Sequence, residues 1–226
     1  VDGTIALTTN STGAATIVND AALTFAASTV GGALTATATT GNITDSGALA
    51  ITGATTLVAS ADNATIALDT TTNAFTGALT ITTNDSSGTD ADVTIDGGTT
   101  ALDIAASTID GDLTLTSGNV SGITDSGTVT VGGNLSATTD ANAGVINLGT
   151  MAVDGTIALT TNSTGAATIV NDAALTFAAS TVGGALTATA TTGDITDSGT
   201  LTITGASIFK TGATGSNIVL DSASNA

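Results

Sequence analysis

The 226-residue chain contains no cysteine, proline, histidine, tryptophan or tyrosine, and a single Lys or Arg residue. Without cysteine, no disulfide framework can form. Nucleic-acid binding requires several cations to replace the counterions of the phosphates, so we expect no nucleic-acid partner. Sugar-cleaving sites generally need aromatic platforms and a pair of tuned proton donors and acceptors. With 2% aromatic residues and no histidine, the chain is not expected to be an enzyme.

All 19 acidic residues are Asp, and the formal net charge is −18. Hydrophobic residues nevertheless make up 41% of the chain, which disfavours a disordered low-complexity segment. No apolar run approaches the roughly 18 residues of a transmembrane helix, so we expect no membrane span. No targeting segment begins the sequence, so a signal for export would lie outside it. We interpret the charge as favouring solubility and repulsion between neighbouring molecules.

A long segment of the chain occurs twice, because Val1–Ala54 reappears as Val153–Ala206. The two copies differ only by Asn42→Asp194, Ala48→Thr200 and Ala50→Thr202. Near-identical long repeats are typical of arrays in which each unit stacks on its neighbour. We therefore divide the chain into one long repeat, residues 1–152, and a partial second copy, residues 153–226, that continues it.

Short runs of alternating apolar and polar residues recur along the chain, and this period of two predicts β-strands. Leu23 and Phe25 form one such pair, and Ile66 and Leu68 form another. Asn, Asp and Gly separate the runs, and these residues tolerate the left-handed conformations of tight corners. Helical spacing is not sustained anywhere, so the sequence predicts an all-β chain.

A finer period indicates how the strands are arranged. An apolar residue, a Gly two positions later and another apolar residue recur, and the copies that begin at Ile109, Val131 and Val153 lie 22 residues apart. Where the interval is longer, we expect the polar stretches at Asn10–Gly13 and Asn84–Asp90 to loop out. One rung therefore contains about 22 residues, the long repeat about seven rungs, and the chain about ten.

Rungs of this size favour a parallel β-helix, or β-solenoid, over a repetitive β-sandwich array. Each strand then pairs with its equivalent in the next rung, at a spacing of about 4.8 Å. The core would be thin, which suits an apolar content of mostly small side chains. We expect a ladder of inward-facing leucines along the tube. Its members are Leu34, Leu57, Leu79, Leu102, Leu113 and Leu135.

Several phrases of the sequence resemble those of filamentous-haemagglutinin-type giant bacterial exoproteins. They are Gly32–Thr37 (GALTAT), Gly41–Gly47 (GNITDSG), Gly77–Thr82 (GALTIT) and Gly111–Thr116 (GDLTLT). The resemblance covers essentially the whole chain and implies a right-handed parallel β-helix. It also implies secretion to the bacterial surface, often by two-partner secretion, and a role as an adhesin or surface filament.

One cluster of carboxylates could hold a metal ion. Asp90, Asp92 and Asp96 share the strand parity of Thr94, opposite to Val93 and Ile95, so they should project outward together. Calcium binds six to eight oxygen ligands, and three carboxylates within seven residues could supply several of them. The alternative is a solvated acidic face. Calcium at this cluster is the only cofactor that the sequence suggests.

The phrase Ile-Thr-Asp-Ser-Gly occurs three times, with its carboxylates at Asp45, Asp125 and Asp197. These positions could mark a repeated site for an ion or a sugar. The alternative, which we favour, is a corner of the Asx type in which each carboxylate accepts nearby backbone N–H groups.

The sequence favours a structural, non-catalytic segment of a long extracellular filament or adhesin stalk on a bacterial surface. Its main partner would be itself, through tandem repeats or axial stacking of rungs. The alternative is an adhesive module whose loops bind a glycan or receptor of a host or neighbouring cell. A polysaccharide-degrading β-helix enzyme is a remote third possibility. The loop residues of the adhesive alternative are Asn10, Ser11, Thr12, Asn84, Asp85 and Ser86.

Overall fold

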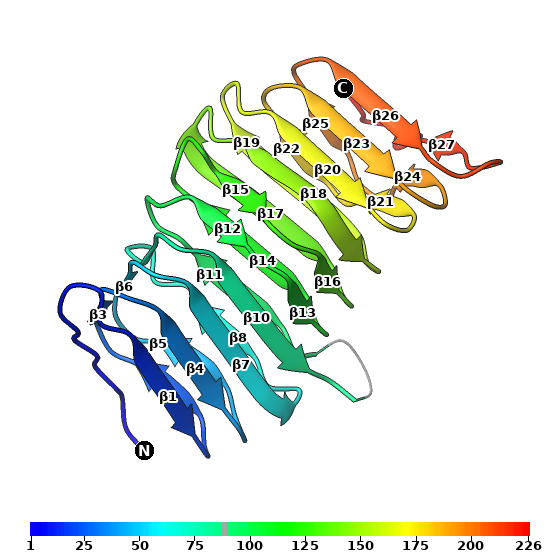
Figure 1. The fold of residues 1–226 in the computed structure, drawn as a ribbon. Helices are drawn as coiled ribbons and strands as arrows, with labels where there is room; N and C mark the ends of the chain where they lie inside the picture. Colours follow the sequence, from blue (N-terminus) through cyan, green and yellow to red (C-terminus); the bar gives the residue numbers. More distant parts are fainter. Residues whose placement is uncertain (87–89) are drawn as a thin grey trace.

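A computed structural model describes residues 1–86 and 90–226. The strands wind into a parallel β-solenoid of about ten rungs, about 21 residues apart, as the sequence predicts. Figure 1 shows the strands stacked along one axis from the N-terminal to the C-terminal end. In the described residues, no helix is long and apolar enough to cross a membrane.

The first of two large sheets has 12 strands, and all its pairs are parallel. Its strands are β1 (Ala15–Asn19), β4 (Leu34–Ala38), β7 (Thr55–Asp62), β10 (Leu79–Asn84), β12 (Leu102–Ile104), β13 (Ser107–Ile109), β15 (Ile123–Asp125), β16 (Val129–Val131), β18 (Ile146–Val153), β20 (Ala167–Asn171), β23 (Leu186–Ala190) and β26 (Ser207–Thr211). Paired residues lie from 19 residues apart, as in Ala15 and Leu34, to 26 apart, as in Thr82 and Thr108.

The second large sheet also has 12 strands, and a small sheet of three strands continues it in the first rungs. The second sheet consists of β2 (Leu23–Phe25), β5 (Ile43–Asp45), β8 (Ile66–Leu68), β11 (Val93–Asp96), β14 (Leu113–Ser117), β17 (Leu135–Asn142), β19 (Thr156–Asn162), β21 (Leu175–Phe177), β22 (Ser180–Val182), β24 (Ile195–Asp197), β25 (Leu201–Ile203) and β27 (Ile218–Val219). The small sheet consists of β3 (Ser28–Val30), β6 (Leu49–Ile51) and β9 (Ala74–Phe75).

Each rung has two sides, and a side is either straight, made of one strand, or bent at a corner. In the first three rungs the second side is bent, because β2, β5 and β8 are each followed by a strand of the small sheet. From β12 to β18 the bend lies in the first sheet instead. It returns to the second sheet at β21 and β22. The bend therefore changes sides along the tube.

The core runs along the axis between the two sides and is filled by alternate residues of each strand. Pleated strands direct successive side chains to opposite faces, so β4 buries Leu34, Ala36 and Ala38 and turns its threonines outward. All six leucines of the predicted ladder are buried. They do not form one column, because Leu34 and Leu79 lie in the first sheet whereas Leu113 pairs with Leu135 in the second.

The two copies of the long repeat occupy equivalent places in the tube. Seven steps along the first sheet lead from β1 to β20, which begin 152 residues apart. None of the three differences between the copies affects a buried position. Position 50, which becomes 202 in the second copy, faces solvent, and positions 48 and 200 are half-buried. The core is therefore the same in both copies.

Candidate functional site

Acidic residues at one corner of the tube link successive rungs. Asp92 Oδ1 accepts the backbone N–H of Asp112 at 2.8 Å, and Asp112 Oδ1 accepts that of Asn134 at 2.6 Å. Asn134 Oδ1 in turn accepts the N–H of Thr156 at 2.8 Å. Each side chain thus satisfies a backbone donor of the next rung at the point where a second-sheet strand begins. This column is structural and leaves these carboxylates engaged within the chain.

The same corner explains the difference between Asn42 and Asp194. Asn42 Oδ1 accepts the N–H of Thr65 at 3.0 Å, and Asp194 Oδ1 accepts the N–H of Asn217 at 2.7 Å. An amide and a carboxylate both provide the acceptor that the position requires. The substitution therefore retains the bond between rungs.

The carboxylates of the Ile-Thr-Asp-Ser-Gly phrases bind the next rung rather than their own corner. Asp125 accepts N–H groups of Gly149 at 2.8 Å and Thr150 at 2.6 Å. Asp45 and Asp197 each accept the side-chain amide of an asparagine 28 residues later, at 2.7 Å. Those asparagines, Asn73 and Asn225, accept the N–H groups of Leu49 and Leu201. The prediction of local Asx-type corners is therefore wrong about the partners, which belong to the following rung.

The structure does not group the three residues of the predicted calcium cluster. Asp90 donates its N–H to Asp85 at 3.0 Å, Asp92 belongs to the corner column, and Asp96 accepts the N–H of Gly98 at 2.7 Å. Among the described residues, no group of three or more acidic, His or Cys side chains is placed to hold a metal ion. None of the three is buried, as strand parity predicts, but Asp90 and Asp92 precede β11, Asp96 is its last residue, and each has a different hydrogen-bond partner.

Asp96 has an unusual environment among these carboxylates. Partial burial raises its pKa, and the carboxylates of Asp140, Asp69 and Asp45 add to that effect, whereas the N–H of Gly98 opposes it. A raised pKa in the folded state means that folding favours the protonated form. Stability that depends on this group is therefore present at low pH and decreases as the pH rises through its folded pKa.

Replacing Asp96 by Asn is expected to stabilise the fold at pH 7, by less than about 1 kcal/mol because the group is only partly buried. The amide keeps the acceptor for Gly98 and removes the charge. At pH 3 the gain should be absent, since Asp96 is then mostly protonated in both states. Urea unfolding at the two pH values measures this.

Asp62→Asn is the control for this prediction. Hydrogen bonds from the backbone and side chain of Ser86 lower the pKa of Asp62, so its charged form favours folding. Its contribution is present above the unfolded pKa and is lost as the pH falls through the folded pKa. Asp62→Asn should therefore lower stability at pH 7, and changes of the same sign in both variants would contradict the assignment.

The two predicted loops differ in structure. Gly13 donates its N–H to Asn10 at 2.9 Å, and Ser11 adopts a left-handed φ of 53°, so Asn10–Gly13 is a tight turn. It stacks under the next rung, where Gly32 donates its N–H to Gly13 at 2.8 Å. This segment is part of the tube wall and does not loop out.

The second predicted loop joins β10 to β11. Asn84 is the last residue of β10, Asp85 donates its N–H to Asp110 at 2.9 Å, and the Ser86 hydroxyl donates to Asp62 at 2.8 Å. Its first residues are thus tied to the rungs on either side. Residues 87–89 lie outside the described part of the chain.

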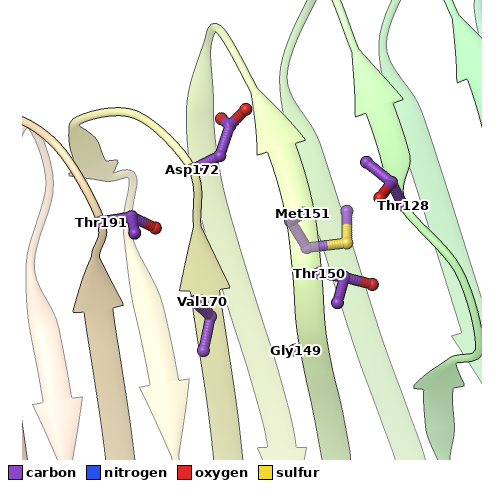
Figure 2. A pocket seen from close by; sticks show the side chains of 7 residues that line it. All are labelled: Thr128, Gly149, Thr150, Met151, Val170, Asp172 and Thr191. Carbon is purple, nitrogen blue, oxygen red and sulfur yellow. The ribbon is translucent and has the colours of Figure 1, made fainter.

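A shallow depression of about 270 Å³ lies on the outside of the first sheet, where the bent β18 meets the straight β20. Figure 2 shows that its lining comes from neighbouring strands, with Met151, Val170 and Asp172 among its residues. Two apolar side chains, three threonines and one carboxylate do not define a specific ligand.

The C-terminal end of the tube exposes core positions. Ile218 is 46% exposed, whereas its equivalent in the first copy, Ile66, is 1% exposed beneath the next rung. A cavity of about 240 Å³ at this end is lined mainly by apolar side chains. One of them, Phe209, packs edge-on against Phe177 at 6.2 Å between ring centres.

A family model described as repeats of unknown function (DUF5649) matches residues 12–82, 90–150 and 164–226. The chain belongs to this family. The first and third DUF5649 matches begin 152 residues apart, the interval of the long repeat. No curated protein and no solved structure is significantly similar to the chain.

The DUF5649 fold also depends on buried polar residues that strand periodicity does not single out. Asn171, Ser107 and Ser180 are buried, although none of them belongs to an acidic cluster or a predicted loop. A sequence signal does exist for the serines, because Ala-Ala-Ser-Thr occurs at residues 26–29, 105–108 and 178–181.

Proposed function

We propose that this DUF5649 chain is a structural, non-catalytic segment of a long extracellular filament or adhesin stalk on a bacterial surface. The observation that carries the proposal is the 152-residue repeat. Seven rungs return the chain to an equivalent place in the tube, so a further copy can continue both large sheets along the axis.

Two further properties support a filament. All strands of the two large sheets pair in parallel, so their hydrogen bonds run along the axis, the direction in which tandem copies would extend the tube. The net charge of −18 repels neighbouring tubes sideways. Growth along the axis is therefore favoured over lateral association. The resemblance to filamentous-haemagglutinin-type proteins agrees with this proposal.

The adhesive alternative is less well supported. Asn10–Gly13, one of its two binding loops, is a turn stacked within the wall. The Gly13 N–H bonds to the Asn10 carbonyl within the turn, and the Gly13 carbonyl accepts the N–H of Gly32 in the next rung. The filament proposal is instead supported by the repeat itself, because the chain returns to an equivalent place in the tube after seven rungs.

The test compares proteins that contain one, two and three tandem copies of residues 1–152. Electron microscopy should show rods that lengthen by about 34 Å per added copy, from seven rungs at about 4.8 Å each. Labelling of intact producing cells should find the native protein on the surface. Separate globular particles, or rods whose length is independent of copy number, would contradict a filament.

A further inference from the structure

We infer that the serine of each Ala-Ala-Ser-Thr phrase bridges the backbone hydrogen bond that is interrupted where a straight side of the tube is followed by a bent one. In all three occurrences the phrase belongs to the rung that directly follows a straight segment along the axis. We call the later rung the upper one and the earlier rung the lower one. Ser107 lies above β10 in the first sheet, and Ser180 lies above β19 in the second. Ser28 lies above residues 5–8, the copy of part of β19.

At each of these places the upper segment contains one residue more than the lower one. In the first sheet Leu79 pairs with Ile104 and Thr82 with Thr108. The lower strand therefore advances three residues between the two pairs, whereas the upper segment advances four. Ile157 and Thr160 face Phe177 and Thr181 in the same way. An extra residue on one strand interrupts the ladder of hydrogen bonds, as in a β-bulge. The bend thus leaves a buried backbone donor without its usual partner.

The serine hydroxyl enters this interrupted bond. In an unbroken parallel ladder, the N–H of Ile81 would donate directly to the carbonyl of Ala105. Instead Ile81 donates to Ser107 Oγ at 3.0 Å, and that hydroxyl donates to the carbonyl of Ala105 at 2.8 Å. One hydroxyl can accept and donate at once, so a single side chain satisfies both groups.

The same relay occurs in the other two places. Leu159 donates to Ser180 Oγ at 3.1 Å, which donates to Ala178 at 2.9 Å. Leu7 donates to Ser28 Oγ at 3.0 Å, and that hydroxyl donates to Ala26 at 2.8 Å. Ser107 is in a different sheet and outside the duplicated segment. Its agreement with the other two is therefore not a consequence of the duplication.

A different side chain accompanies the change from bent to straight. The bent β18 has one residue more than β20 above it, since Leu148 and Met151 face Ile169 and Asn171. The Asn171 amide accepts the N–H of Val153 at 2.8 Å and donates to its carbonyl at 3.0 Å. The amide thus substitutes for the peptide group that the shorter strand lacks.

The test is residue-resolved hydrogen exchange on the Ser107→Ala variant. Alanine removes the relay and leaves the N–H of Ile81 unpaired. Exchange at Ile81 should accelerate about 10- to 100-fold relative to other β10 amides. Ser126→Ala is the matched control, because Ser126 is exposed at the next bend of the same sheet. It should leave Ile81 unchanged.

Unchanged exchange at Ile81 in folded Ser107→Ala would overturn the inference, as would equal acceleration in Ser126→Ala. If Ser107→Ala does not fold, Ser28→Ala provides the same readout at Leu7 in the first rung, where fewer rungs depend on it. There too, an unchanged Leu7 amide would overturn the inference.

Discussion

Replacing Gly122 by alanine is expected to lower the free energy of unfolding by about 3–5 kcal/mol. Gly122 has a φ of 65°, in the left-handed region where alanine is strained. An added Cβ would also overlap the carbonyl oxygen of Val145 in the next rung. That oxygen accepts the N–H of Ile123 at 3.0 Å, so it cannot move away without loosening the pairing of β15 with β18.

Gly149→Ala is the matched control for this prediction. A Cβ at Gly149 would meet only a carboxylate oxygen of Asp125, at 3.9 Å, an ordinary contact distance. We expect a change within about 1 kcal/mol, of either sign. Urea unfolding followed by circular dichroism measures both variants. Equal losses of unfolding free energy in the two variants would contradict the assignment. They would show that the close contact between Gly122 and Val145 does not require glycine at this position.

The tube itself could be predicted from the sequence because its inward positions obey a simple rule. Most inward positions of the strands are apolar in each rung, and the leucines of the expected ladder are all buried. The spacing of about 22 residues follows from the same requirement repeated along the axis. Both signals are local or strictly periodic, and so they can be seen in a single sequence.

The roles of the polar residues could not be predicted because their partners lie one rung away. Asp125 bonds to Gly149 and Thr150, at separations of 24 and 25 residues that vary from rung to rung. Rungs differ in length by several residues, so the partner of a given carboxylate depends on the register of both strands. For the same reason, residues close in sequence, such as Asp90 and Asp96, do not form a common site.

The bend that changes sides is a second feature that periodicity does not predict. Straight and bent segments have the same inward pattern, and they differ by one residue relative to the rung beneath. The repeated Ala-Ala-Ser-Thr phrase is visible in the sequence. Its meaning depends on whether the segment below is straight, as β10 is beneath Ser107.

Replacing Asn171 by alanine is expected to cost about 3–5 kcal/mol of unfolding free energy. Asn171 is fully buried, and its amide makes two bonds to Val153 and a third to the carbonyl of Ala174 at 2.7 Å. Alanine would leave these backbone groups unpaired in the core and create a cavity beside them. Each unpaired buried group costs about 1–3 kcal/mol, partly relieved by local movement.

The measurement compares Asn171→Ala with Asn147→Ala, an exposed asparagine on β18 whose loss should cost less than about 0.5 kcal/mol. Urea unfolding gives the two free energies, and hydrogen exchange at Val153 shows whether protection is lost at the N–H that Asn171 accepts. Val153 should lose protection in Asn171→Ala and keep it in Asn147→Ala. Similar losses of unfolding free energy in both variants would contradict the prediction. They would mean that β20 can pair with the bent β18 without the Asn171 amide in place of the missing peptide group.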